Sequence, residues 1–402
     1  MTHTWTSDVG TAGQKCPHLA ANTKDFTETF HETLHTARAQ LPVAWDDTTG
    51  RWFVMGADTL FEVAQNWETF SSAHGVAEAY VPKLLPIDSD PPLHTQWRSI
   101  LNRHFTKAAV DRRAEEIRKI VSEFIDAMAP AGRADLVREL AEPLPGRIFF
   151  QAMLRLLDED LERCTQQVEM AMDYGHPKVQ AAGFAGLFEV CAQLVDRRSA
   201  AAPNDDSIAD SVVHARIDGQ PVSKQDATSI LAMLVLGGLE TTVNTLGASL
   251  LHLAQDPDLQ DRLRSDPDLM PTAVEEFLRL YTPVVYLGRY VQKDTELAGL
   301  SIAAGQRVSL SFAAACRDPE KFEEPDLFRL DREHYRHYAF GVGIHRCLGS
   351  NLARLVLRLA LQTVLDRLGD MRLAESFTPT YRVSSVRGLE RLDVTFSSRA
   401  TA

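Results

Sequence analysis

The sequence predicts a mainly α-helical fold, with one helical body and small β-sheets towards both ends of it. Helical periodicity of apolar residues covers most of the chain after residue 90, whereas strand signals are few and short. Length alone would allow two to three domains among 402 residues, but no linker, repeat or low-complexity stretch divides them. We therefore expect a single domain over 1–402, with a flexible N-terminal segment at 1–22 that is rich in threonine, glycine and serine.

Helices are predicted where apolar residues recur at a spacing of three and four. A helix also begins after the pair Pro91-Pro92, because proline suits the first helical position. Ser223 and Asp226 form a capping box ahead of the longest helix. The segments with helical periodicity are 111–128, 145–157, 161–174, 182–198, 224–255, 271–281 and 350–368.

Short strands are predicted in three places. Residues 43–57 should form a hairpin around the turn-forming sequence DDTTG at 46–50. Two further small β regions lie at 284–310 and 381–396. The sheets are therefore expected to be minor parts of the fold.

Composition and charge narrow the function classes. The chain is 45% hydrophobic and 24% charged, and its net charge of −13 argues against nucleic acid as a partner. Five cysteines form no CxxC pair and their number is odd, which favours a reducing cytosol. The longest apolar run, 230–239, is too short for a membrane span, and the start of the chain is polar. We expect a soluble, cytoplasmic protein without a membrane anchor.

The most informative segment is 340–349, with the sequence FGVGIHRCLG, which places Cys347 in a glycine-rich turn just before the last long helix. Gly341 and Gly343 can adopt backbone angles closed to other residues, so the chain can curl around the sulfur. Gly349 has no side chain, so the start of the next helix can lie against a flat group. The free amides and the positive dipole end of that helix favour a thiolate, which is a good ligand for haem iron.

The alternative is that Cys347 only packs in the core, because a lone cysteine is more often a small buried hydrophobe. However, the complete pattern F-G-x-G-x-H-x-C-x-G resembles the cysteine-ligand loop of the cytochrome P450 family. The resemblance implies a single α-rich fold that encloses haem b, iron-protoporphyrin IX, with Cys347 as the metal ligand. It also implies that His345 contacts a haem propionate.

The middle of the helix at 224–255 contains Gly237-Gly238 followed by Glu240-Thr241 in otherwise apolar surroundings. Two glycines inside a helix cost about 1 kcal/mol each relative to alanine, which a close approach of a ligand or of another backbone would explain. Taken alone, the segment favours a packed helix in which the Thr241 hydroxyl bonds to the Gly237 carbonyl. Beside the cysteine loop it resembles the family's oxygen-binding helix, where a kinked groove accepts dioxygen. That resemblance implies that Glu240 and Thr241 are catalytic and deliver protons.

Three further side chains are candidates for the haem propionates. His94 and Arg98 share one helix face at a spacing of four, which suits a pair of carboxylates, although in isolation they would be surface residues. The family resemblance assigns both to the propionates. It assigns Arg289 a similar role by its position in the strand after the helix at 271–281.

A scaffold for the cysteine loop is also predicted. Glu276 and Arg279 lie on one helix face, which by itself is a routine helix pair. With the cysteine loop downstream they resemble the family's E-x-x-R motif, whose third member would be Arg332. We expect this triad to hold the loop without a chemical role.

The substrate pocket follows from the resemblance alone. In the family it is built from the loop before the helix at residue 90, the central helix, the strand after 271–281 and the C-terminal turn. The residues expected to line it here are Tyr80, Leu236, Gly237, Val284 and Val285. Such an aliphatic lining favours a small apolar substrate, a terpenoid or an aromatic, and the central helix looks most like camphor-type terpene hydroxylases. In the strand, valines are more often ordinary sheet packing.

The resemblance predicts a haem-thiolate monooxygenase that inserts one oxygen atom of dioxygen into an apolar C–H bond. Electrons would come from NAD(P)H through a separate ferredoxin and ferredoxin reductase, because the sequence shows no nucleotide fingerprint. One alternative is a peroxide-driven peroxygenase, against which the Glu240-Thr241 pair argues. Another is a non-catalytic haem sensor or carrier.

Basic residues gather near the predicted haem on a chain of net charge −13. A charge run is usually a solvated face, but a basic patch here would orient an acidic partner by attraction. We therefore expect an acidic ferredoxin as the electron donor, and a monomeric protein. The basic residues are Arg103, Lys107, Arg112, Arg113, Arg346, Arg354 and Arg358.

Overall fold

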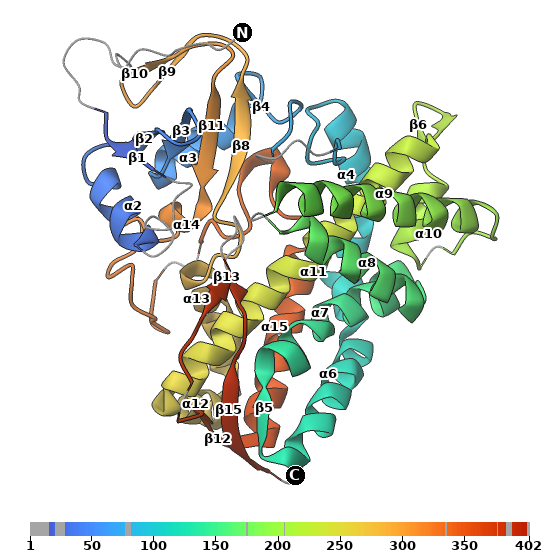
Figure 1. Cartoon of the computed structure of the whole chain (residues 1–402), viewed down its shortest axis with the longest axis vertical. Helices are drawn as coiled ribbons and strands as arrows, with labels where there is room; N and C mark the ends of the chain where they lie inside the picture. The colour runs from blue at the N-terminus through green and yellow to red at the C-terminus, as the bar shows by residue number, and fades with distance from the viewer. Residues whose placement is uncertain are drawn as a thin grey trace.

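The computed structural model describes residues 16–20, 29–76, 82–173, 176–204, 206–333, 336–375, 377–382 and 388–399. A body of helices fills most of the molecule, and a six-stranded sheet lies against one end of it (Figure 1). A three-stranded sheet lies at the opposite end, close to the C-terminus (Figure 1). The predicted mainly helical fold with sheets at both ends is confirmed.

Most of the predicted helices are present with ends shifted by a few residues. The helix α11 (Lys224–Gln255) has the predicted bounds, because the Ser223 hydroxyl accepts the Asp226 N–H and caps its start. The other helices that match predicted segments are α4 (Leu93–Phe105), α6 (Ala114–Met128), α8 (Asp158–Ala171), α9 (Pro177–Ser199), α13 (Met270–Leu280) and α15 (Ser350–Arg367).

The predicted helix at 145–157 begins too late. Helical turns already start at Val137, where the π-helical segment η2 (Val137–Ala141) precedes α7 (Pro143–Ile148) and a second π-helical segment η3 (Phe149–Leu154) follows. Prolines occupy the first positions of α7, where a missing N–H costs nothing, so they mark a restart and not the beginning.

Six short helices among the described residues were not predicted from the sequence, because one to three turns show too few repeats of the apolar pattern. These helices are α2 (Phe30–Arg38), α3 (Ala57–Gln65), α5 (Lys107–Asp111), α10 (Ile208–Val213), α12 (Pro257–Ser265) and α14 (Phe312–Ala315). Of these, α2 and α3 pack on strands of the six-stranded sheet, whereas α5, α10 and α12 pack mainly on longer helices.

The six-stranded sheet combines two predicted β regions. The predicted hairpin is confirmed as β2 (Val43–Asp46) and β3 (Arg51–Val54), which are antiparallel. The region 284–310 supplies β8 (Tyr286–Val291) and β11 (Arg307–Ser311), and β11 pairs in parallel with β3. The remaining strands are β1 (His18–Leu19) and β4 (Phe70–Ser71), in the order β1-β2-β3-β11-β8-β4. Two more strands of that region form a separate pair, β9 (Thr295–Leu297) and β10 (Leu300–Ile302).

The predicted β region at 381–396 is also confirmed. Its last strand β15 (Asp393–Ser398) lies between β12 (Leu368–Leu373) and β5 (Arg133–Asp135). The shorter strands β13 (Tyr381–Arg382) and β14 (Gly388–Leu389) pair with each other. A further pair, β6 (Arg216–Ile217) and β7 (Gln220–Pro221), precedes α11.

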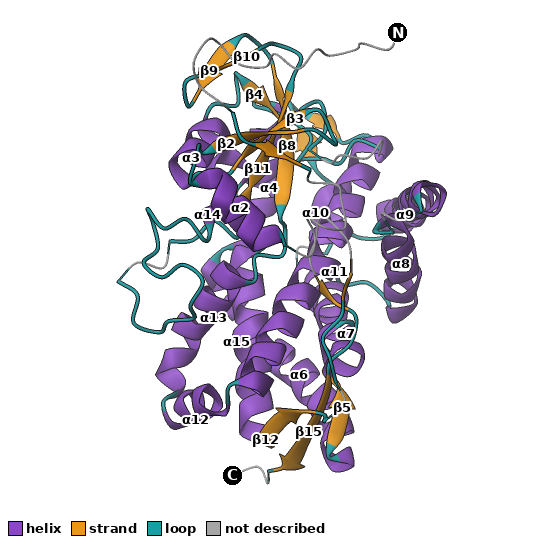
Figure 2. Ribbon diagram, turned by 60° about the vertical axis from the view of Figure 1, so that its left-hand side comes forward, coloured by secondary structure: helices purple, strands orange, loops and turns teal. Residues whose placement is uncertain are grey.

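α11 is the central helix of the body and contacts α7, α9 and α15 (Figure 2). By length and composition it is the one helix among the described residues that could cross a membrane. The expectation of no such segment considered only the uninterrupted apolar run. Most of the apolar part of α11 is buried inside the protein, which is what a core helix shows as well.

Candidate active site

The cysteine loop has the geometry that its glycines predict. Gly341 has a φ of +65° and Gly343 a φ of +74°, both in the left-handed region. A Cβ on Gly343 would lie 2.3 Å from the carbonyl oxygen of Ala64 at the end of α3, so only glycine fits there. The loop closes through a 2.7 Å hydrogen bond from the Cys347 N–H to the Phe340 carbonyl.

Cys347 is the exposed member of the five cysteines, whereas Cys164, Cys191 and Cys316 are buried. Burial in the surrounding protein nevertheless raises the pKa of the Cys347 thiol, although a hydrogen bond from the Gly349 N–H and the nearby arginine Arg98 lower it. The sulfur is therefore reachable from solvent on one side and enclosed by protein on the others. Its contact with the Gly349 amide is the predicted helix-start contact.

Gly349 leaves open space in front of the start of α15. A Cβ built on this residue would meet no atom within 4 Å. The structure thus has both features that the sequence predicts for binding a flat group here: an accessible sulfur, and a helix start with nothing pressed against it.

Four basic side chains from three parts of the chain come together near this loop. The rings of His94 and His345 lie 4.3 Å apart between centroids, and Arg98 donates to the Arg346 carbonyl at 2.9 Å. Arg289 on β8 is buried and donates to the neighbouring Gly288 carbonyl. We call His94, Arg98, Arg289 and His345 the cationic cluster.

The electrostatics of the cationic cluster favour a negatively charged ligand. Burial, together with the charges of Arg98 and Arg289, lowers the pKa of His345 to about 2 and that of His94 to about 4. Both rings are therefore neutral near pH 7, and the positive charge of the cluster comes from its two arginines. Burial also lowers the pKa of Arg289 to about 10, against the opposing effect of Asp90. Crowded positive charge of this kind is relieved by a ligand that brings carboxylates.

One atom of the cluster lacks a partner. Nε2 of His345 is buried and has no hydrogen-bond partner among the described residues. A buried polar atom without a partner is costly and usually marks a ligand or water position. Together with the accessible sulfur and the space at Gly349, it fits a group that carries a metal and two carboxylates, as haem b does.

The two glycines of α11 have different surroundings. A Cβ on Gly238 would lie 2.8 Å from the ring of Phe149, so close packing by a side chain explains that residue. A Cβ on Gly237 would touch only Met233, at 3.4 Å, and Gly237 is exposed although its neighbours Leu236 and Leu239 are buried. The helix thus has a bare backbone position at Gly237 that faces open space.

Thr241 makes the hydrogen bond of the packed-helix alternative: its hydroxyl donates to the Gly237 carbonyl at 3.0 Å. Glu240 and Thr241 are both half-buried, and α11 stays α-helical through this stretch. Because the Thr241 proton is engaged with the backbone, the oxygen lone pairs remain able to accept a hydrogen bond.

The predicted triad is present, but its arginines bind the segment 323–327 and make no hydrogen bond to the cysteine loop among the described residues. Arg279 donates to both carboxylate oxygens of Glu276, at 2.7 and 2.9 Å, and Arg332 donates at 3.0 Å. All three side chains are nearly or fully buried. The hydrogen bonds of the two arginines to backbone carbonyls in the segment 323–327 tie that segment to α13.

Asp88 was not predicted as a site residue. Its buried carboxylate accepts the N–H of Val76 at 2.9 Å and of Leu84 at 2.8 Å, and its charge acts on Arg289. Nearby, the hydroxyl of Ser229 on α11 accepts the Leu85 N–H and donates to a backbone carbonyl. The sequence shows only an aspartate two positions before Asp90, and its burial is evident from the structure alone.

The predicted pocket residues are only partly brought together. Leu236 and Gly237 lie on one stretch of α11, and Val284 is half-buried before β8. Val285 is buried among core residues such as Phe53 and Ala313. Tyr80 and most of the C-terminal turn lie outside the described residues.

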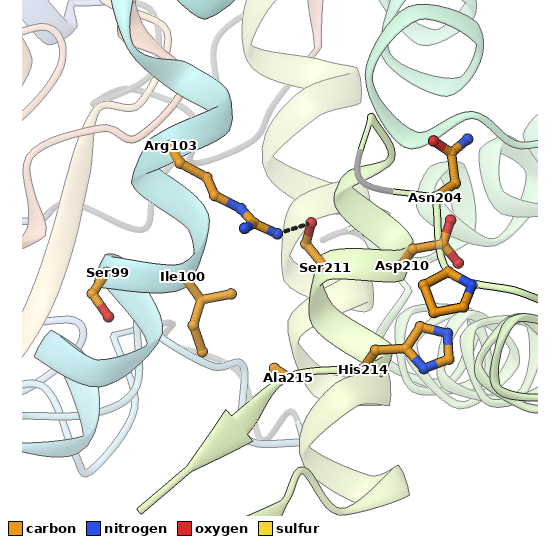
Figure 3. A pocket seen from close by; sticks show the side chains of 9 residues that line it. Ser99, Ile100, Arg103, Asn204, Asp210, Ser211, His214 and Ala215 are labelled. Carbon is orange, nitrogen blue, oxygen red and sulfur yellow. Dashed lines mark hydrogen bonds between the residues drawn. The ribbon is translucent and has the colours of Figure 1, made fainter. Parts of the chain in front are cut away.

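Two hollows in the structure lie away from the predicted pocket residues that the structure describes. One of about 330 Å³ lies between α4 and α10, where Arg103 donates to the Ser211 hydroxyl (Figure 3). A neighbouring hollow of about 230 Å³ is lined by Arg103, Arg112 and Arg113. Neither is lined by Cys347 or by the middle of α11, so they are separate from the candidate active site.

Comparisons with known proteins agree with this geometry. The family model described as cytochrome P450 matches residues 184–369. The chain is 32% identical over 377 residues to a steroid C26-monooxygenase of Mycolicibacterium smegmatis, which covers 92% of this chain and 93% of that protein. It is 33% identical over 388 residues to a methyl-branched lipid omega-hydroxylase of Mycobacterium tuberculosis, which covers 90% of each.

Solved structures show the same fold. CYP109E1 of Bacillus megaterium, determined in complex with testosterone, matches with a TM-score of 0.85 at 27% identity over 93% of this chain and 99% of that one. CYP108D1 of Novosphingobium aromaticivorans matches with a TM-score of 0.82 at 30% identity, over 93% of this chain and 95% of that one. With an exposed cysteine in a glycine-rich loop, basic side chains beside it and relatives of this kind, the chain belongs to the cytochrome P450 family.

Proposed function

We propose that this haem b monooxygenase binds its iron through Cys347 and hydroxylates a small apolar substrate with electrons from an acidic ferredoxin. The observation that carries the proposal is the accessible Cys347 sulfur in its glycine loop, next to the open space at Gly349. Haem b, when bound, supplies the activation of dioxygen. The cationic cluster would hold the two propionates, with His345 Nε2 gaining the partner it lacks.

The test for the metal ligand is the spectrum of the reduced protein with carbon monoxide. We expect the strongly red-shifted Soret band of thiolate ligation, and we expect Cys347→His to abolish it. Cys16→Ser, which changes a cysteine in the N-terminal strand region, serves as the control and should keep the band. Retention of the band in Cys347→Ala would show that another cysteine is the ligand.

We assign proton handling to Glu240 and Thr241. The Thr241 hydroxyl, which donates to the Gly237 carbonyl, can accept a hydrogen bond, and the half-buried carboxylate of Glu240, one position earlier, can exchange protons with solvent. Thr241→Ala should therefore still bind substrate and consume NADH, but release peroxide in place of product. Equal coupling of NADH to product in Thr241→Ala and the native protein would remove Thr241 from the mechanism.

We propose a terpenoid or a small aromatic compound as the substrate, because Leu236, Gly237 and Val284 offer an aliphatic surface. The names of the relatives add steroids and methyl-branched lipids as larger apolar candidates. Screening these four classes for a spin-state shift of the haem spectrum distinguishes them. A shift with only the larger compounds would replace the small-substrate proposal.

For the electron donor, the structure changes the choice of residues. Arg354 is paired with Glu275, so it is not a free surface cation as the basic-patch prediction assumed. Arg112 and Arg358 are exposed and form no ion pair among the described residues, and α15 contacts both α4 and α5. These residues and the exposed Arg346 are the better candidates for attracting an acidic ferredoxin.

Charge reversal tests this surface. Arg112→Glu and Arg358→Glu should slow first-electron transfer from an acidic ferredoxin at low salt, with little change in substrate affinity. The loss should shrink as ionic strength rises, because exposed charges are screened over roughly 8–10 Å at physiological salt. Unchanged stopped-flow rates in both variants would exclude the patch, and turnover that depends on peroxide but not on NADH would favour the peroxygenase alternative. We further propose a cytoplasmic monomer.

A further inference from the structure

We propose that Glu275, through Arg354 and His337, is a positioning residue that holds the first residue of the cysteine loop and thereby the thiolate ligand. The inference rests on the proposed role of Cys347. It concerns a second network beside the Glu276 scaffold, centred one residue earlier on α13, which no sequence pattern singles out.

The network begins with a fork-to-fork ion pair. Arg354 on α15 donates to the two carboxylate oxygens of Glu275 through Nε at 2.6 Å and Nη2 at 2.8 Å. Such bidentate pairs fix the plane of the guanidinium as well as its distance. The Glu275 side chain is 20% exposed and that of Arg354 is 30% exposed, so solvent screens the attraction between them only in part.

His337 adds a second donor with a defined tautomer. Its Nδ1 accepts the Ala339 N–H at 3.1 Å, so in the neutral ring the proton is on Nε2. Nε2 lies 3.2 Å from the Glu275 carboxylate and donates to it. The His337 side chain is almost fully buried, and its ring is held between the Ala339 N–H and the Glu275 carboxylate.

Both partners of Glu275 contact Phe340. The guanidinium carbon of Arg354 lies 4.4 Å from the centre of the Phe340 ring, within the range of a cation–π contact. The ring of His337 lies 5.7 Å away. Phe340 thus contacts the guanidinium of Arg354 and the imidazole of His337. Both groups are hydrogen-bonded to the Glu275 carboxylate.

Phe340 connects this network to the cysteine. Its carbonyl accepts the Cys347 N–H at 2.7 Å, the hydrogen bond that closes the loop. A shift of Phe340 therefore moves the backbone of Cys347 directly. The position of the sulfur relative to the Gly349 amide depends on that backbone, and hydrogen bonds to a ligating sulfur tune the metal site.

The experiment compares Glu275→Gln with a matched control, Glu116→Gln. Glu116 forms an ion pair with Arg155 at 2.6 Å on a part of α6 away from the loop, and it is also partly exposed. Glu275→Gln keeps the size of the side chain and removes its charge. Each haem-loaded variant is reduced, bound to carbon monoxide and held at the same interval below its own midpoint of thermal unfolding, so that a general loss of stability cancels.

The readout is the rate at which the red-shifted thiolate Soret band is lost. We expect Glu275→Gln to lose it about tenfold faster than the native protein, the effect of losing one charge-assisted hydrogen bond, and Glu116→Gln to match the native rate. The haem reduction potential should shift in Glu275→Gln and stay unchanged in the control, while substrate affinity changes little in either.

Arg354→Lys provides the second variant. It keeps the positive charge but loses the bidentate fork and the flat contact with Phe340, so it should lose the band faster as well. If Glu275→Gln does not retain haem, the rate of band loss in Arg354→Lys tests the inference in its place. Native rates and an unchanged potential in these variants would overturn the inference. Absence of the red-shifted band in the native protein would instead overturn the proposed role of Cys347.

Discussion

Two groups of buried charges near the cysteine loop differ in how completely they are paired. In the first, which we call the scaffold cluster, Glu275 and Glu276 on α13 each accept hydrogen bonds from two side chains, and every distance is that of a direct hydrogen bond. The second is the cationic cluster, where two histidines and two arginines gather around a buried nitrogen without a partner.

The difference in pairing distinguishes a cluster with a structural role from a cluster that binds a ligand. A cluster whose charges are matched inside the protein needs no ligand, and it becomes costly only when one partner is removed. A cluster with excess charge of one sign is at a disadvantage until a ligand of opposite charge arrives, as at functional sites in general. The same contrast exists on α11, where Phe149 fills the space at Gly238 and nothing fills that at Gly237.

The largest expected effect comes from breaking the scaffold cluster. Glu276→Ala leaves Arg279, a fully buried arginine, without its carboxylate. Removing one partner of a buried ion pair costs about 3–5 kcal/mol, so we expect the free energy of unfolding in urea to fall by that amount. A loss below about 1 kcal/mol, the range of surface pairs, would show that this cluster is not what holds the segment 323–327 to α13.

Removing a charge from the cationic cluster should raise the free energy of unfolding of the haem-free protein, whereas breaking the scaffold cluster lowers it. Burial lowers the pKa of Arg289, so its charge is held at a cost, and Arg289→Met should stabilise the haem-free protein by about 1–3 kcal/mol. Haem affinity should fall about 10–100-fold, because a charge-assisted bond to a propionate is lost. Urea unfolding and haem transfer to apomyoglobin measure the two effects. A less stable haem-free variant would contradict the idea that this cluster is incomplete by itself.

The pairing of Glu275 predicts an acid-dependent stability. Burial alone would raise the pKa of Glu275, but the hydrogen bonds from Arg354 and His337 lower it to about 2, below its ordinary value of 4.5. A carboxyl with a lowered folded-state pKa stabilises the fold above pH 4.5, and this stability is lost as the pH falls towards 2. The difference corresponds to about 3 kcal/mol.

The measurement is the free energy of unfolding between pH 5 and pH 3 in the native protein and in Glu275→Gln. The native protein should lose more stability than the variant over this interval, because the variant lacks the titrating group. Parallel pH profiles in the two proteins would mean that Glu275 does not contribute.

The smallest effect concerns the two glycines of α11. Gly237→Ala should stabilise the protein by about 1 kcal/mol, because alanine favours the helix and only Met233 is near. Gly238→Ala should destabilise it, because the added Cβ would press on Phe149. Thermal unfolding of both variants gives the signs, and reduced product formation in Gly237→Ala would show that the open position is used. A destabilised Gly237→Ala would contradict the open surroundings described for that position.

The sequence predicts well what depends on local pattern. The bounds of α11, the hairpin at 43–57 and the Glu276–Arg279 pair follow from spacing within one segment. The cysteine loop is predictable because its glycines have a local reason, namely positive φ angles at Gly341 and Gly343.

Contacts between distant segments are what the sequence does not reveal. The pairing of β11 with β3 and the binding of Arg354 by Glu275 depend on how whole elements pack, which no spacing records. Arg354 was consequently predicted as a surface cation, and His337 and Asp88 were passed over. The role of Gly238 was open for the same reason, because the ring that it accommodates belongs to η3.

The distance along the chain between the donors of the site has a consequence for biosynthesis. At roughly 5–20 residues per second, the ribosome needs on the order of 10–50 s to proceed from His94 to Cys347. During that time the nascent chain carries first His94 and Arg98 and later Arg289 and His345, but not Cys347, so it cannot hold haem in the proposed final geometry. On the proposed role of Cys347, haem therefore binds in its final geometry only late in synthesis, and until then the Cys347 side chain is exposed to solvent.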